Sequence, residues 1–324
     1  MVNEEKLDEF GAREKPLAVL RTGVGIQTGE FTTGVFQGGT VWAGPLVHLA
    51  KPLPMAILAA EHYNRIGRLL ARKVPVKVQL EIRTEVDETY KNESFNVIGE
   101  IPGGAKKEEI VMVGAHLDSW PFATGATDNA IGCAVAMEAM RILRSLKMDR
   151  TVRLALWGGE EQGRLGSRAY VKEHFANRAD MRLKPEHEEL SAYFNIDGGS
   201  GRIRGIYLRR NEMARPIFEN WFVALKDLTS GAVSIRDIDD EKPAFSDHMS
   251  FDEVGLPGFQ FLQDPLDFET RSLHTNMDTF DRIQTGDSEQ MAVVVASFLY
   301  NAATRSEKLP RKELPAPQQP ASRR

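Results

Sequence analysis

The stretch IVMVGAHLD, residues 110–118, decides the fold of this chain. Its first six residues are apolar without alternation, which predicts a strand that is covered on both faces. Two polar side chains, His116 and Asp118, follow where the apolar run ends. Because strands buried on both faces occur in sheets flanked by helices, the stretch predicts an α/β fold.

Further apolar runs on both sides of this stretch support the same architecture. Residues 95–101 form a strand candidate that is joined to it through Pro-Gly-Gly, so the two strands are predicted to pair as a hairpin. Downstream, strands and helices alternate, which indicates a mostly parallel sheet sandwiched by helices and made mixed by the hairpin. The predicted elements are strands 151–157, 190–196, 205–208 and 258–262 and helices 130–146, 167–175, 213–228 and 287–302.

The two ends of the chain have other patterns. The C-terminal segment is rich in proline and charge with little apolar surface, which predicts disorder. The N-terminal part predicts a strand at 16–21, a glycine-rich and threonine-rich loop at 22–44, a helix at 54–73 and a strand at 76–86. The predicted domains are an accessory domain at 1–90, a catalytic domain at 91–305 and a disordered tail at 306–324.

Composition excludes several classes of protein. The 46 acidic and 41 basic side chains are interspersed and give a net charge of -5, so no nucleic-acid surface is predicted. No run reaches the roughly 18 apolar residues of a membrane span, and residues 1–10 lack the apolar core of a secretion signal. The single cysteine, Cys133, lies in an apolar helix and is predicted to be a buried structural thiol.

Metal-binding side chains gather where predicted strands end. Glu160 and Glu161 follow strand 151–157, and Asp197 follows strand 190–196, as His116 follows the first strand. Asp128 precedes a helix, where the strand-to-helix connection places it at the same edge of the sheet. Imidazole nitrogen and carboxylate oxygen are zinc ligands, so this edge predicts a metallohydrolase.

Each of these residues also has an ordinary structural explanation. An aspartate before a helix, such as Asp128, is commonly an N-cap, and paired glutamates commonly lie in a solvated loop. Their recurrence at successive strand ends favours a shared site instead. The adjacent glycines 158–159 and 198–199 lack a phosphate-loop pattern and are interpreted as tight turns beside the ligands. Two basic candidates for a substrate clamp, the pair at 209–210 and Arg271, are interpreted as solvated surface.

Six motifs, in this order, resemble those of the co-catalytic zinc exopeptidases that include bacterial leucyl aminopeptidase, and especially the plasma glutamate carboxypeptidase (carboxypeptidase Q) branch. The motifs are VMVGAHLDSW, GATDNAIG, LWGGEEQGRLGS, FNIDGGSG, FSDH and LHTNMDTFD. The resemblance covers about residues 94–303, while residues 1–90 resemble the later part of the protease-associated domain that this branch inserts into its catalytic domain. It implies that the chain begins inside this insert and that the protein is secreted or periplasmic.

The resemblance also implies two zinc ions per chain. His116, Asp128 and Asp197 resemble the ligands of one zinc. Asp128, Glu161 and His274 resemble the ligands of the other, so that Asp128 bridges the two ions. Two zinc ions roughly 3.5 to 4 Å apart need a bridging carboxylate to offset their repulsion.

Three further residues match the motifs. Glu160 resembles the general base, and Asp118 resembles the carboxylate that receives the His116 N–H and fixes its tautomer. His248, in FSDH, matches a motif from which no role can be derived. The implied reaction is hydrolysis of a terminal peptide bond of a small peptide or dipeptide, by an aminopeptidase or a carboxypeptidase.

Two other functions stay open. A glutaminyl-cyclase-type acyltransferase on the same fold would use one zinc, and a non-catalytic binding protein would have lost ligands. The complete ligand set favours the peptidase, and metal stoichiometry with chelator-sensitive cleavage would distinguish the three. The expected partner is a small peptide, and the oligomeric state is left open, a homodimer included.

Overall fold

The chain forms two compact units. The computed structural model describes residues 10–11, 13–22, 54–83, 85, 89, 94–121, 123–230, 233–236 and 246–318. The first unit comprises residues 1–93, 120–124 and 267–279, and the second comprises residues 94–119, 125–266 and 280–324. Among the described residues, no helix combines the length and the apolar character that crossing a membrane requires.

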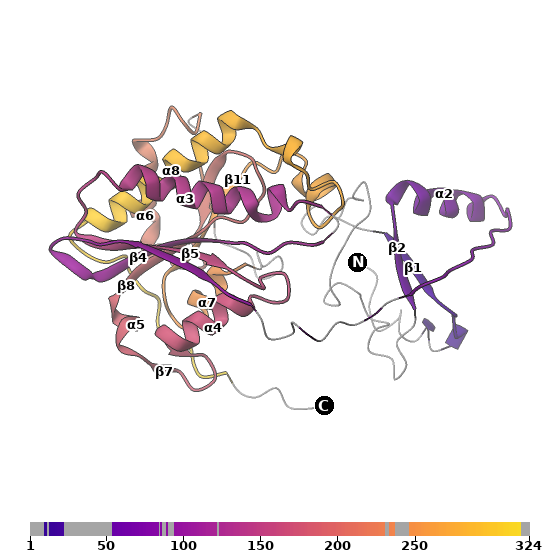
Figure 1. The fold of residues 1–324 in the computed structure, drawn as a ribbon, viewed down its shortest axis with the longest axis horizontal. Helices are drawn as coiled ribbons and strands as arrows, with labels where there is room; N and C mark the ends of the chain where they lie inside the picture. The colour runs from indigo at the N-terminus through magenta and orange to yellow at the C-terminus, as the bar shows by residue number, and fades with distance from the viewer. Residues whose placement is uncertain are drawn as a thin grey trace. The chain divides into compact units, whose positions relative to one another are not determined.

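A mixed, seven-stranded sheet forms the centre of the second unit (Figure 1). Its strands are β3 (Val97–Ile101), β4 (Lys106–His116), β5 (Arg150–Trp157), β8 (Leu190–Asn195), β9 (Ile203–Tyr207), β10 (Ser234–Arg236) and β11 (Gly258–Gln263). They lie in the order β10-β9-β11-β8-β4-β5-β3. The four strands from β11 to β5 run parallel, whereas β3 is antiparallel to β5 and β9 is antiparallel to β11. This confirms the predicted mixed α/β sheet.

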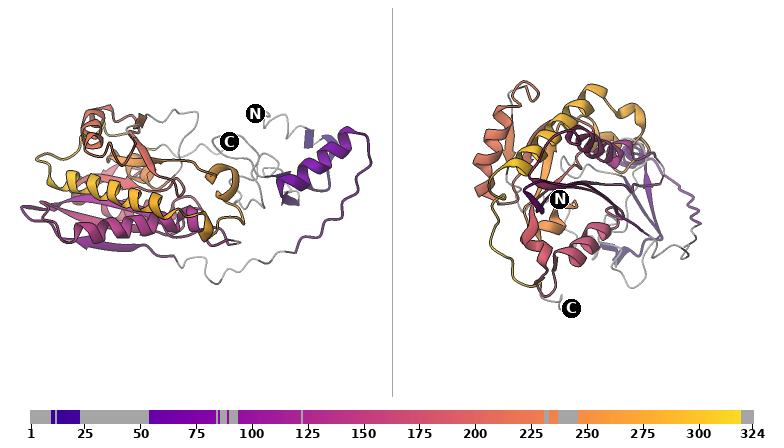
Figure 2. Two further views of the ribbon diagram at one scale, coloured as in Figure 1. Left: turned by 90° about the horizontal axis from the view of Figure 1, so that it is seen from above. Right: turned by 60° about the vertical axis from the view of Figure 1, so that its left-hand side comes forward.

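Helices cover both faces of this sheet (Figure 1, Figure 2). One face carries α3 (Ile131–Leu143), α6 (Arg215–Val223) and α8 (Thr285–Thr304), and the other carries α4 (Leu165–His174), α5 (Pro185–Glu189) and α7 (His248–Asp252). Successive side chains of β4 enter opposite cores, Val111 and Val113 on the first face and Ile110 and Met112 on the second. The prediction that this strand is covered on both faces is therefore confirmed.

The predicted hairpin is wrong, because β5 lies between β3 and β4. The connection crosses the start of β5: Gly104 donates its N–H to the carbonyl of Met148 at 2.9 Å, and Lys106 pairs with Arg150. A turn signal in the sequence shows that the chain reverses, but it does not show which strands become neighbours. β5 pairs with β3 on one side and with β4 on the other, and β3 becomes the last strand of the sheet.

The first unit contains a small parallel sheet. Its strands β1 (Val19–Thr22) and β2 (Met55–Leu58) are followed by helix α2 (Ala60–Ala71). The helix predicted for 54–73 thus begins late, because the apolar residues at its start pair with β1 instead. The predicted strand 76–86 is also wrong for its described residues, 76–83 and 85, which contain no strand. Most of the predicted loop 22–44 lies outside the described residues.

The C-terminal segment packs against the second unit over its described residues, 306–318, which corrects the expected disorder. Leu309 is 2% exposed within the core, and its N–H donates to Ser191 Oγ at 3.1 Å. The Arg311 guanidinium donates to the carbonyls of His187 and Leu190 at 2.6 and 2.7 Å. Average composition cannot reveal such contacts, because they are made by individual residues such as Leu309 and Arg311.

Leu309→Ala should lower the free energy of unfolding by about 2–4 kcal/mol, because it leaves a cavity in the core. The measurement is urea unfolding, with Leu314→Ala as the matched control, since Leu314 lies in the same segment but is 55% exposed. The control should change stability by less than about 0.5 kcal/mol. Equal effects of the two substitutions would contradict the packing of this segment.

Candidate metal centre

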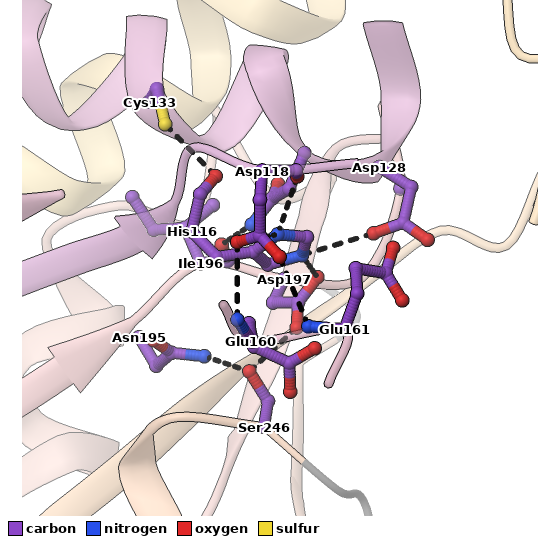
Figure 3. Close-up of polar contacts among 12 residues, drawn as sticks. His116, Asp118, Asp128, Cys133, Glu160, Glu161, Asn195, Ile196, Asp197 and Ser246 are labelled. Atoms are coloured by element: carbon purple, nitrogen blue, oxygen red, sulfur yellow. Dashed lines mark hydrogen bonds and ion pairs between the residues drawn. The ribbon is translucent and has the colours of Figure 1, made fainter. Parts of the chain in front are cut away.

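Three neighbouring strands end in metal-binding side chains (Figure 3). His116 is the last residue of β4, Glu160 and Glu161 follow β5, and Asp197 lies just beyond β8. These strands are parallel neighbours, so their carboxyl ends share one edge of the sheet. The backbone of Gly159, at φ +70°, makes the turn that precedes the two glutamates, a conformation that favours glycine. This outcome agrees with the interpretation of the glycine pair as a tight turn.

Asp128 reaches the cluster from the turn Ala126–Ala130, which precedes α3 and in which Asp128 and Asn129 have non-helical backbone dihedrals. It does not cap α3, whose cap position is Ala130 and carries no side-chain cap hydrogen bond. The adjacent Asn129 instead donates to the carbonyl of Ile196 at 2.7 Å, which ties this turn to the end of β8. The buried Asp128 carboxylate is thereby held against the His116 ring, with Oδ1 at 3.1 Å from Nε2.

The His116 ring is the centre of the cluster. Its Nδ1 lies 2.9 Å from the carbonyl of Asp118, which can only accept, so Nδ1 carries a hydrogen. Its Nε2 faces two carboxylates, Asp128 at 3.1 Å and Asp197 at 3.3 Å. Burial lowers the pKa of His116, but the charge of Asp197 and the proximity of the Asp118, Asp128 and Asp197 carboxylates outweigh it and hold the pKa well above its usual value. The space between His116 Nε2 and the carboxylates of Asp128 and Asp197 therefore favours a positive charge.

Asp118 supports the cluster in a different way from the one that the resemblance implies. Its carboxylate Oδ1 is 3.6 Å from His116 Nδ1, too far for a good hydrogen bond, and the ring binds the main-chain oxygen instead. The carboxylate accepts the backbone N–H groups of Glu160 at 3.1 Å and Glu161 at 3.2 Å. Burial raises the pKa of Asp118, yet His116 and these N–H groups lower it below its usual value. Asp118 therefore holds both the ring and the glutamate pair.

The donor set fits a divalent cation. Ligand atoms of His116, Asp128 and Glu161 lie within 4.8 Å of one another, and those of His116, Glu160 and Asp197 form a second such group. Burial raises the pKa of Glu160 well above its usual value, with the charges of Asp197 and other acids adding to this shift and His116 opposing it. A cation would offset the repulsion among these carboxylates, and the mixture of imidazole and carboxylates suits zinc.

His274 belongs to the first unit. Its ring packs edge-on against Trp120, with the ring centroids 5.9 Å apart. The second unit therefore brings together most of the residues singled out in the sequence, while the zinc-binding role of His274 stays a prediction. The residues brought together are His116, Asp118, Asp128, Glu160, Glu161 and Asp197.

Sequence reasoning missed two polar residues that hold Asp197. Ser246 Oγ donates to Asp197 Oδ2 at 2.5 Å, and Gln260 Nε2 donates to its main-chain oxygen at 2.7 Å. Ser246 lies in the FSDH motif, in which only His248 attracted attention. Gln260 is a polar residue in the middle of a buried apolar strand, and this was the signal available in the sequence.

Three other polar candidates, His248, Arg209 and Cys133, lie outside the two groups of ligand atoms. His248 is fully buried at the start of α7, where burial and the charges of Arg209 and Arg164 hold its pKa well below the usual value, so it is neutral. Arg209 is half-buried, and its guanidinium Nη2 lies 3.7 Å from Asp252 Oδ2. This corrects its interpretation as solvated surface. Cys133 is a free, half-buried thiol whose pKa burial raises to about 11, so it is a poor nucleophile.

A mixed α/β sheet with a buried imidazole and carboxylates at its carboxyl edge defines a metallohydrolase architecture. The family model described as "Peptidase family M28" matches residues 96–299, and the chain belongs to this family. The chain is 28% identical over 262 residues to carboxypeptidase Q of Homo sapiens, covering 80% of this chain and 52% of the relative. It is 30% identical over 222 residues to aminopeptidase YwaD of Bacillus subtilis (strain 168), covering 66% and 46%. The chain thus spans about half the length of the curated relatives it matches.

Solved structures show the same fold. The peptidase M28 precursor from Shewanella amazonensis SB2B has a TM-score of 0.69 at 26% identity, covering 94% of this chain and 63% of the other. BSAP, a zinc aminopeptidase from Bacillus subtilis, has a TM-score of 0.53 at 27% identity, covering 65% and 51%. These findings confirm the family and the fold that the motifs implied.

Proposed function

We propose that this protein is a di-zinc exopeptidase that hydrolyses a terminal peptide bond of a small peptide or dipeptide. The observation that carries the proposal is the buried His116 ring among carboxylates at the ends of adjacent parallel strands. Membership of the M28 family and the likeness to a zinc aminopeptidase support it. In this proposal His116, Asp128 and Asp197 bind one zinc, and Asp128, Glu161 and His274 bind the other.

Bound zinc would supply the electrophile, polarising the scissile carbonyl and lowering the pKa of a water molecule. Glu160 would take a proton from the attacking water and deliver it to the leaving amine. Its carboxyl lies within the cluster, and its raised pKa suits a group that must hold a proton between the two transfers. Asp118 would keep Glu160 in place through the backbone hydrogen bond.

Metal content and peptide cleavage together test this proposal. We expect two zinc ions per chain by elemental analysis, and cleavage of small peptides that a chelator stops and added zinc restores. One zinc without cleavage would favour the glutaminyl-cyclase-type acyltransferase, and no zinc in a chain that circular dichroism shows to be folded would favour a binding protein. Peptides blocked at the amino or the carboxyl end would then show which terminus is required.

A further inference from the structure

A chain of buried hydrogen bonds leads from the core of the second unit to Asp197. Trp157 Nε1 lies 2.8 Å from Tyr193 Oη, and the Tyr193 hydroxyl bonds to Asn195 Oδ1. Asn195 Nδ2 lies 2.7 Å from Ser246 Oγ, which lies 2.5 Å from Asp197 Oδ2. Figure 3 shows the last two links, and the four residues that precede Asp197 are all buried.

The two end groups of this hydrogen-bond series, Trp157 and Asp197, determine the direction of every hydrogen bond in it. The indole N–H of Trp157 can only donate, and Asp197 Oδ2 accepts from the Ser246 hydroxyl. Tyr193 therefore accepts from the indole and donates its own hydrogen to Asn195 Oδ1. The amide of Asn195 then presents Nδ2 to Ser246, whose hydroxyl hydrogen is left to point at Asp197.

Asn195 is the branch point of the network. Its Nδ2 also lies 2.6 Å from Gln260 Oε1, and Gln260 Nε2 donates to the main-chain oxygen of Asp197 at 2.7 Å. One amide thus holds both the side chain and the backbone of Asp197. The Tyr193 hydroxyl donates to Asn195 Oδ1 and so fixes the orientation of this amide. In the reversed orientation the Asn195 oxygen would face Gln260 Oε1, and two acceptors would meet. The orientation therefore matters for the hydrogen bonds to both Ser246 and Gln260.

Gly114 leaves the space that the hydrogen bond between Trp157 and Tyr193 needs. A Cβ at this position would lie 2.6 Å from Tyr193 Oη and 2.8 Å from Trp157 Nε1. Gly114 pairs with Asn195 in the sheet, two residues before His116, so the space lies directly behind the cluster. Burial raises the pKa of the Tyr193 hydroxyl well above its usual value, which keeps it protonated as a donor.

We propose that Tyr193 is a positioning residue of the metal centre, which acts through Asn195 and Ser246 to hold Asp197 Oδ2 and keep Oδ1 beside His116 Nε2. This role rests on the proposed function, because it takes Asp197 as a zinc ligand. Groups that orient a metal ligand contribute about 10-fold to 100-fold in metal affinity. The Tyr193 hydroxyl, three hydrogen bonds from the carboxylate, should contribute at the lower end of this range.

The test is the zinc affinity of Tyr193→Phe, measured by competition with a chromogenic chelator. We expect the Kd for zinc to rise about 10-fold, with a lower kcat and little change in KM. Tyr170→Phe is the matched control. The Tyr170 ring also packs against Trp157, with the ring centroids 5.2 Å apart, but its hydroxyl accepts a hydrogen bond from Arg153 instead. It should keep the wild-type Kd, and urea unfolding of the metal-free variants would show whether both lose similar stability.

A double substitution distinguishes the hydrogen-bond chain from a packing effect. In a Ser246→Ala background, Tyr193→Phe should have little further effect on the Kd, because the link to Asp197 is already broken. Additive effects would overturn the proposal, as would a wild-type Kd for Tyr193→Phe or an equal loss in Tyr170→Phe. A wild-type protein that binds no zinc would instead contradict the proposed function itself.

Asn195→Asp provides a second variant in case Tyr193→Phe does not fold. A carboxylate at this position accepts from Ser246, so the Ser246 hydroxyl can no longer donate to Asp197. Simple charge attraction predicts tighter zinc binding from the added carboxylate, whereas the hydrogen-bond chain predicts weaker binding. A lower Kd than that of the wild type would overturn the proposal, and a higher Kd would support it.

Discussion

Glu160→Gln should lower kcat for a small peptide by about 10²-fold to 10⁴-fold while both zinc ions stay bound. Glutamine keeps the size of the side chain, and the backbone N–H that bonds to Asp118 is unchanged. The amide cannot accept a proton from water and return it to the leaving amine. Turnover and zinc content, measured on the same preparation by peptide assay and elemental analysis, check this expectation.

Glu161→Gln is the matched control for this substitution. Glu161 makes the equivalent backbone hydrogen bond to Asp118, and its carboxylate groups with His116 and Asp128. As a proposed ligand it should lose zinc, and its turnover should fall in step with its zinc content. Equal zinc loss in the two variants would contradict the division of the pair into a proton-transfer group and a ligand.

Much of the site could be predicted because strand ends are visible in a sequence. An apolar run that stops at a polar residue marks the edge of a sheet, and this located His116, Glu160, Glu161 and Asp197. The residues that hold these side chains come from distant segments. Ser246 precedes α7, and Gln260 lies in β11, the neighbour of β8, the strand that leads to Asp197.

The errors in the predicted fold share a cause, which is that pairing is decided by distant partners. Residues 95–101 and 110–115 have the local pattern of a hairpin, yet β5 separates them. Residues 55–58 have a helical context, yet they pair with β1. The described tail has the composition of a disordered segment, but Leu309 enters the core. Local patterns thus located most of the elements of the second unit, and tertiary contacts determined the neighbours.

Asp128→Ala should remove zinc from the protein and bring turnover below detection, because Asp128 is the proposed ligand of both ions. A readout independent of activity is the effect of zinc on stability. Zinc at about 100 times its Kd should stabilise the wild type by roughly 2.7 kcal/mol, since it binds the folded chain. The variant should lose this zinc-dependent gain in urea unfolding.

Without zinc, Asp128→Ala should be no less stable in urea than the metal-free wild type. Asp128 is buried beside other carboxylates that repel it when no cation is present, so replacing it relieves part of this repulsion even as the hydrogen bond to His116 is lost. Asp227→Ala, on the exposed surface of the same unit, is the control and should keep the full stabilisation by zinc. If Asp128→Ala retained two zinc ions and the zinc-dependent gain, the bridge would have to be another carboxylate, and Glu160 would be the next candidate because it already lies within the cluster.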